Sequence, residues 1–66
     1  MNIVVNGKKQ EVEPGTTVTK LLMSLDLDPD RVAIELNLAI VSKDQCANTT
    51  LAEGDSLEIV QFVGGG

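Results

Sequence analysis

The sequence contains no histidine, tryptophan or tyrosine, and only one phenylalanine and one cysteine. Without histidine, the commonest general acid or base and a usual zinc ligand are missing. We therefore expect no resident metal, no bound cofactor and no catalysis by the chain itself. A single cysteine, Cys46, cannot form an internal disulfide, and its neighbours Asp44, Ala47 and Asn48 offer nothing that would lower the pKa of its thiol. We expect Cys46 to be a small, partly buried apolar residue and not a sulfur relay.

Basic residues are also scarce, since five Lys and Arg stand against ten Asp and Glu, for a net charge of −5. Nucleic acids and anionic membranes are bound through Lys and Arg, so this balance argues against both as partners. A basic protein surface suits it better. Residues 1–6 lack the basic region and the long apolar run of a signal peptide, which predicts a cytoplasmic protein.

The 66 residues, 42% of them hydrophobic, suffice for one small domain with one core. Apolar residues alternate over residues 1–5, and the pair Asn6-Gly7 that follows is typical of a type I′ turn. A hairpin is therefore predicted at the start of the chain. Its return strand, residues 8–13, offers only Val12 as an apolar side chain, which indicates the edge of a sheet. Pro14-Gly15 ends that strand.

The clearest helix follows the hairpin. Val18, Leu21, Leu22 and Leu25 recur at helical spacing on one stripe, and the two threonines before them are candidate N-caps. We predict a helix over residues 18–26, limited by the proline that follows Asp28.

The second half of the chain predicts three strands and one helical turn. Strands are expected at residues 32–36 and 39–41, and Ser42 with Gln45 resembles a capping box for a turn that carries Cys46. Leu51 is a candidate core residue, and Glu53 to Asp55 are expected to form a turn. The last strand is predicted at residues 56–63, with Leu57, Ile59, Gln61 and Val63 on one face and Ser56, Glu58, Val60 and Phe62 on the other.

This order of elements predicts an α+β fold of the ubiquitin-like β-grasp type, with one helix packed on a small mixed sheet and the first and last strands parallel at its centre. We assign residues 1–63 to this domain. Residues 64–66, the triglycine segment Gly64-Gly65-Gly66, are expected to form a flexible C-terminal tail.

Glycines carry no side chain, so the triglycine segment suits a narrow channel that would exclude other residues. Most chain ends are merely frayed, but this one follows directly from an apolar strand, and this favours a function. Phe62 and Val60, on the outer face of that strand, are candidates for docking a partner, although a core position for Phe62 is equally compatible with the pattern.

At this point the chain resembles the ThiS family of ubiquitin-like sulfur carriers along essentially its whole length. The matching segments are residues 3–7 (IVVNG), 14–18 (PGTTV) with Leu21-Leu22, 32–37 (VAIELN), Ile40-Val41, 51–60 (LAEGDSLEIV) and 63–66 (VGGG). The Leu38-Ala39 step departs from the family, whose members are often polar there.

The resemblance implies that an E1-like enzyme adenylates the Gly66 carboxylate with ATP, and that a persulfide supplied by a cysteine desulfurase or another donor converts it to a thiocarboxylate. The sulfur would then pass to thiazole synthase, for thiamin biosynthesis. Gly64 and Gly65 would provide access for Gly66. Three alternatives stay open: the small subunit of molybdopterin synthase, a protein modifier joined to lysines, and a β-grasp interaction module in which the glycines are incidental.

Overall fold

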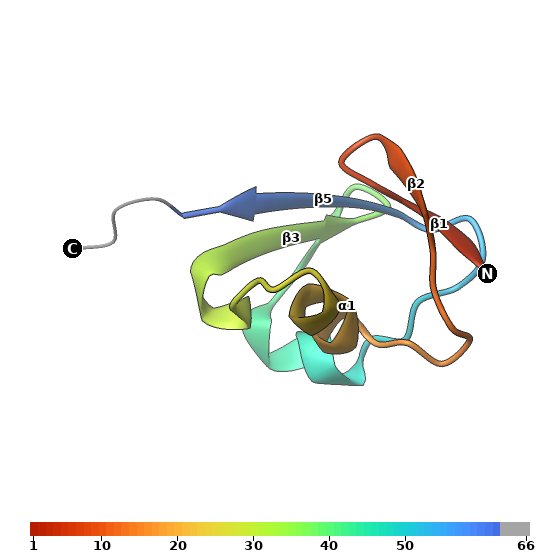
Figure 1. Ribbon diagram of the computed structural model, residues 1–66. Helices are drawn as coiled ribbons and strands as arrows, with labels where there is room; N and C mark the ends of the chain where they lie inside the picture. The colour runs from red at the N-terminus through yellow and green to blue at the C-terminus, as the bar shows by residue number, and fades with distance from the viewer. Residues whose placement is uncertain (63–66) are drawn as a thin grey trace.

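The computed structural model of the protein describes residues 1–62. Its elements are the strands β1 (Asn2–Val5), β2 (Lys8–Glu11), β3 (Val32–Leu36), β4 (Ala39–Val41) and β5 (Ser56–Gln61), the helix α1 (Val18–Ser24) and the 3₁₀ helices η1 (Pro29–Arg31) and η2 (Lys43–Asn48). The strands form one sheet in the order β2-β1-β5-β3-β4, in which β1 and β5 are parallel and the other neighbours antiparallel. The predicted parallel pairing of the first and last strands is confirmed (Figure 1).

The first hairpin forms as predicted. Asn6 and Gly7 both have positive φ angles, 50° and 82°, which a type I′ turn requires, and Val5 pairs with Lys8 across it. β2 lies at the sheet edge but ends at Glu11, two residues earlier than expected. Beyond it, Val12 still exchanges backbone hydrogen bonds with Met1, both at 2.8 Å, before the chain leaves the sheet.

Helix α1 buries three residues of the predicted apolar stripe, Val18, Leu21 and Leu22, whereas the fourth, Leu25, is the C-cap residue and is half-buried. The Thr17 hydroxyl accepts a hydrogen bond from the backbone N–H of Lys20 at 3.2 Å, and this caps the first turn. The helix ends at Ser24 and not at residue 26, because Asp26 adopts a left-handed φ of 60° that cannot continue a right-handed helix.

Two local predictions were incomplete or wrong. Pro29 is expected from the sequence only to limit the helix, but it is also the first residue of η1. Asp28 caps this 3₁₀ helix, because its Oδ1 accepts a hydrogen bond from the N–H of Asp30 at 2.9 Å. The helical turn around Cys46 exists as η2, but the capping box is wrong, since the Ser42 side chain makes no capping hydrogen bond. The Ser42 carbonyl accepts from the Gln45 N–H instead, at 2.9 Å.

The helices lie on one side of the sheet, and the core fills the space between (Figure 1). Its buried members come from strands, helices and the loop after η2: Ile3, Val5, Val18, Leu21, Leu22, Ile34, Cys46, Leu51 and Leu57. No helix within residues 1–62 has the length and apolar character to span a membrane. The architecture is the predicted ubiquitin-like β-grasp, and it leaves the other side of the sheet without a covering element among the residues described.

Candidate functional site

The predicted site residues divide into two groups. The triglycine segment, with Gly64, Gly65 and Gly66, lies outside the described residues, as does Val63, so the flexible tail and the modification site stay predictions. The residues that lead to that segment are described. They are β5 and Phe62.

β5 is the central strand of the sheet. Its first residues pair with β1 through Val5 and Leu57, whereas its last five residues pair with β3, from Leu36 opposite Leu57 to Val32 opposite Gln61. Leu57 is fully buried and anchors the strand in the core. The strand ends at Gln61 and not at residue 63, so Phe62 follows it instead of belonging to it.

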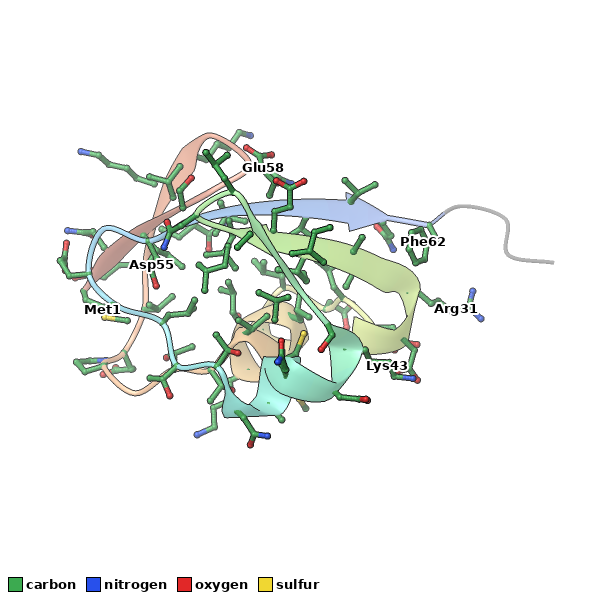
Figure 2. All side chains as sticks on the ribbon, turned by 180° about the vertical axis from the view of Figure 1, so that it is seen from behind. Met1, Arg31, Lys43, Asp55, Glu58 and Phe62 are labelled. Carbon is green, nitrogen blue, oxygen red and sulfur yellow. The ribbon has the colours of Figure 1, made fainter. Side chains whose placement is uncertain are left out.

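The side chains expected on the outer face of β5 are exposed. Val60 is 61% exposed and Phe62 is 56% exposed, which excludes a core position for Phe62. The backbone of Phe62 is nevertheless fixed, because its N–H donates to the carbonyl of Arg31 at 2.8 Å. Phe62 and Arg31 thus lie together at one end of the described domain (Figure 2).

Asn6 and Asn37 hold β5 in place through side-chain hydrogen bonds. The sequence predicts only turns at these two residues. Asn6 bonds the backbone of Ile59 with both side-chain amide atoms, and Asn37 Oδ1 accepts from the Ser56 N–H at 2.9 Å. Asn37 Nδ2 also donates to Asp55 Oδ1 at 3.0 Å. These partners are far away in sequence, so no local pattern could have revealed them.

The turn before β5 is built as expected. Asp55 Oδ2 accepts a hydrogen bond from the Ala52 N–H at 2.7 Å, and Glu53 Oε1 accepts one from the Asn2 N–H at 3.0 Å. Both carboxylates therefore serve the local structure, which agrees with their interpretation as turn residues.

Cys46 is 3% exposed, and its Sγ lies 3.5 Å from the Ser42 carbonyl oxygen, to which the thiol donates. Burial raises the pKa of the Cys46 thiol above its ordinary value. The thiol therefore stays protonated at neutral pH, and the interpretation of Cys46 as a packing residue is supported.

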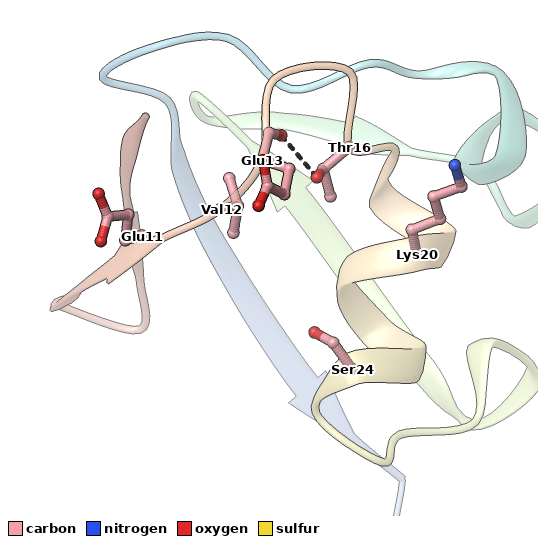
Figure 3. A pocket seen from close by; sticks show the side chains of 6 residues that line it. All are labelled: Glu11, Val12, Glu13, Thr16, Lys20 and Ser24. Carbon is pink, nitrogen blue, oxygen red and sulfur yellow. Dashed lines mark hydrogen bonds between the residues drawn. The ribbon is translucent and has the colours of Figure 1, made fainter.

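A hollow of about 250 Å³ lies between the end of β2 and α1 (Figure 3). It is lined by Glu11, Val12, Glu13, Thr16, Lys20 and Ser24. Within it the Thr16 hydroxyl donates to the Glu13 carbonyl at 2.7 Å, a contact that closes the loop before α1. Within residues 1–62, no three acidic, histidine or cysteine side chains are grouped so as to hold a metal ion.

Comparison with known proteins places these features in one family. The model of the ThiS family matches residues 3–66. The sulfur carrier protein ThiS of Bacillus subtilis is 38% identical over 63 residues, which cover 94% of this chain and 96% of that protein. The crystal structure of the thiamine biosynthesis protein ThiS from Geobacter metallireducens superimposes with a TM-score of 0.84 at 36% identity, and covers 100% of both chains.

A different kind of relative is longer. A thiazole synthase of Magnetococcus marinus is 44% identical over all 66 residues, yet the chain spans only 20% of that protein's length. The family match over nearly the whole chain and the shared structure lead to one conclusion. The chain belongs to the ThiS family of sulfur carrier proteins and has the ubiquitin-like β-grasp fold.

Proposed function

We propose that this chain carries sulfur as a thiocarboxylate on Gly66. An E1-like enzyme joins the Gly66 carboxylate to AMP from ATP and releases pyrophosphate. A persulfide, generated by a cysteine desulfurase or another donor, attacks the activated carbonyl, so that a C–S bond forms and AMP leaves. A thiol then attacks the donor's sulfur and forms a disulfide with it, and the sulfur bound to Gly66 leaves as the thiocarboxylate. We propose that these steps take place in the cytoplasm, where ATP is available to the adenylating enzyme.

The observation that carries this proposal is the extent of the family match, which runs through residues 3–66 and so includes the triglycine segment. The fold supports it, because the central strand β5 leads toward these residues from a fixed position. The chain itself then supplies no catalytic group. Gly66 provides the carboxylate, and Gly64 and Gly65 keep the approach to it narrow.

We propose thiazole synthase as the enzyme that consumes the sulfur. Two proteins named thiazole synthase contain a segment 44% identical to this chain within a fivefold longer polypeptide, since the chain covers 20% of each. A carrier joined to its acceptor enzyme has a high effective concentration at that enzyme's site. The existence of such chains supports a direct contact between carrier and synthase.

We further propose that Val60 and Phe62 dock against the enzyme that receives the triglycine segment. Both are large apolar side chains, more than half exposed, and both precede the segment on the same stretch of chain. Exposed apolar side chains at such a place gain free energy only when a partner covers them.

The direct test is the intact mass of the protein isolated from its native cells, because replacement of one oxygen by sulfur adds a defined increment. Fragmentation should place that increment on Gly66. A population that stays at the unmodified mass, even after incubation with ATP, the cognate adenylating enzyme and a persulfide donor, would contradict the proposal.

Two variants separate the role of the carboxylate from that of the approach. Deletion of Gly66 should abolish adenylate formation, whereas Gly65→Val keeps the carboxylate but adds a β-branched side chain and should block transfer sterically. Circular dichroism of both variants should match the parent protein. Unchanged kcat/KM for either variant would count against the role given to that residue.

A further inference from the structure

The side of the sheet opposite α1 carries a hollow. It has a volume of about 140 Å³ and is lined by Ala33, Ile34, Glu35, Ile40, Glu58 and Val60. Pockets for small molecules usually measure about 300–1,000 Å³, so this one has the size for a single side chain. We call it the open-face hollow.

The rim of the open-face hollow is apolar. Ile40 on β4 is 81% exposed and Val60 on β5 is 61% exposed, and Ala33 on β3 lies directly opposite Val60 in the ladder. Two large aliphatic side chains exposed around one depression gain free energy when a partner covers them. The rim therefore fits the apolar part of an incoming protein side chain.

The open-face hollow also holds two carboxylates at close quarters. Glu35 and Glu58 are direct partners across the β3–β5 ladder, so their side chains leave the sheet on the same side, and Figure 2 shows Glu58 on the side away from the helices. Side chains in this relation have Cβ atoms about 4.5–5.5 Å apart, and like charges there destabilise the sheet.

No cation compensates this pair within residues 1–62. The ion pairs of that part of the chain join Arg31 to Asp28 and Lys43 to Asp30, on η1 and η2. Both glutamates are exposed and have no hydrogen-bond donor among the described side chains. The free domain thus presents two neighbouring carboxylates that form no ion pair within residues 1–62, and an external cation could pair with both.

We propose that the open-face hollow receives an arginine or lysine side chain from the adenylating enzyme, with the cationic head between Glu35 and Glu58 and the methylene stem along Ile40 and Val60. Arginine is the better fit, because its planar guanidinium can donate to both carboxylates while its stem packs on apolar surface. Nucleic acid does not fit a doubly acidic depression. The net charge of −5 also attracts a basic partner surface over a longer distance.

The open-face hollow and the triglycine segment are close in sequence, because residues at the end of β5 line the hollow. Val60 lines the open-face hollow, and Phe62 follows two residues later toward Gly66. Gly66 stands eight positions after Glu58, which is at most about 26 Å of extended chain at about 3.3 Å per residue. One enzyme surface of ordinary size, about 800 Å² on each partner, can cover both. This inference rests on the proposed function, because it assigns the cation to the enzyme that activates Gly66.

The test compares two double variants of equal net charge. Glu35→Gln with Glu58→Gln removes the charges but keeps the shape, and Glu11→Gln with Glu13→Gln makes the same charge change at the far edge of the sheet. Binding to the cognate adenylating enzyme is measured by calorimetry at low and high salt. We expect the first pair to weaken binding about tenfold or more, and the control pair less than about threefold.

The melting temperature is an independent measurement, and it should change in the opposite direction from binding. Because Glu35→Gln with Glu58→Gln removes two like charges that face each other across the ladder, its Tm should equal or exceed that of the parent protein while its binding falls. Ile40→Ala should also weaken binding with little change in Tm, since that side chain is mostly in solvent. Rising salt should reduce the difference between the parent protein and the first pair.

Two results would overturn the inference. Equal weakening by the two double variants would reduce the effect to general charge, and unchanged binding by the first pair would leave the open-face hollow without the proposed occupant. Either result is separable from the proposed function, because thiocarboxylate on Gly66 is followed in the same samples by mass. A carrier that is modified normally but insensitive at Glu35 and Glu58 would sink only the inference.

Discussion

The side chain of Asn6 binds both backbone groups of Ile59: Asn6 Oδ1 accepts from the Ile59 N–H at 2.7 Å, and Asn6 Nδ2 donates to the Ile59 carbonyl at 3.2 Å. β1 has turned away at this point, since its last partner on β5 is Leu57. The asparagine amide therefore continues the ladder where the backbone of β1 no longer can. It holds the part of β5 that leads to Phe62.

We predict that Asn6→Gly lowers the free energy of unfolding by about 1–2 kcal/mol, because glycine accepts the φ of 50° but forms neither bond to Ile59. Asn6→Ala should cost about 1 kcal/mol more, since alanine is strained at a positive φ. Urea titration measures both values. Hydrogen exchange should show loss of protection at the Ile59 amide in both variants, and full protection there would contradict the bracing role.

Much of this fold could be predicted because its signals are local. Asn6-Gly7 defines the first hairpin, and the stripe of Val18, Leu21 and Leu22 defines the helix. Errors arose where a short polar residue could satisfy the backbone in more than one way. Ser42 and Gln45 have the spacing of a capping box, but the Ser42 carbonyl, and not its hydroxyl, accepts the hydrogen bond from the Gln45 N–H.

The features of the candidate site that sequence reasoning missed depend on long-range pairing. Glu35 and Glu58 are 23 positions apart in the sequence, and only the register of β3 on β5 makes them neighbours. Strand alternation places Val60 and Phe62 on the outer face of the last strand, but it leaves a core position for Phe62 equally possible, and only the structure shows that Phe62 is exposed. The hollow beside Val60 could not be anticipated, because it needs Ile40 from a third strand.

Leu38 provides a prediction about strain. It has a φ of 72° and is 91% exposed, so a bulky side chain occupies a left-handed turn position without gaining burial. Leu38→Gly should raise the free energy of unfolding by about 0.5–1 kcal/mol, as the turn between β3 and β4 becomes an Asn-Gly pair. Thermal and urea unfolding measure the change.

Leu38→Ala is the matched control for this turn. It removes the exposed side chain but retains a Cβ at the strained position, so its stability should stay within about 0.5 kcal/mol of the parent protein. If alanine stabilises the domain as much as glycine does, the cost of Leu38 arises from its exposed apolar surface and not from its backbone.

Cys46 predicts a specific pH dependence of stability. Because burial raises the pKa of its thiol, the folded protein keeps the proton at pH values where the unfolded chain has released it. The contribution is complete below the ordinary thiol pKa of about 8.5, and it is lost as the pH rises above that value. Urea unfolding between about pH 7.5 and 10 should show a decline that is smaller in Cys46→Ala.

The same residue tests the assignment of sulfur chemistry to Gly66 alone. Cys46→Ser should form the Gly66 thiocarboxylate within a few-fold of the parent rate, after correction for any loss of folded protein. Loss of thiocarboxylate formation in a folded Cys46→Ser protein would show that the thiol relays sulfur despite its burial.

Phe62 gives the sharpest prediction for docking, because its side chain and its backbone have separate roles. The Phe62 N–H bonds the Arg31 carbonyl at 2.8 Å, and this contact survives substitution of the side chain. We therefore expect Phe62→Ala to leave Tm nearly unchanged, while the dissociation rate from the adenylating enzyme rises by an amount equivalent to about 1–4 kcal/mol. Stopped-flow or surface-binding kinetics measures that rate.

Salt and a matched control separate this anchor from the charge of the carrier. Added salt should slow association of the parent protein and of Phe62→Ala alike, because long-range attraction acts on encounter and not on the apolar contact. Met23→Ala is the control, since Met23 is 67% exposed on α1, on the other side of the sheet. It should leave both rates unchanged. If Phe62→Ala melts far lower while its folded fraction binds normally, Phe62 stabilises the domain and the partner must dock through other residues.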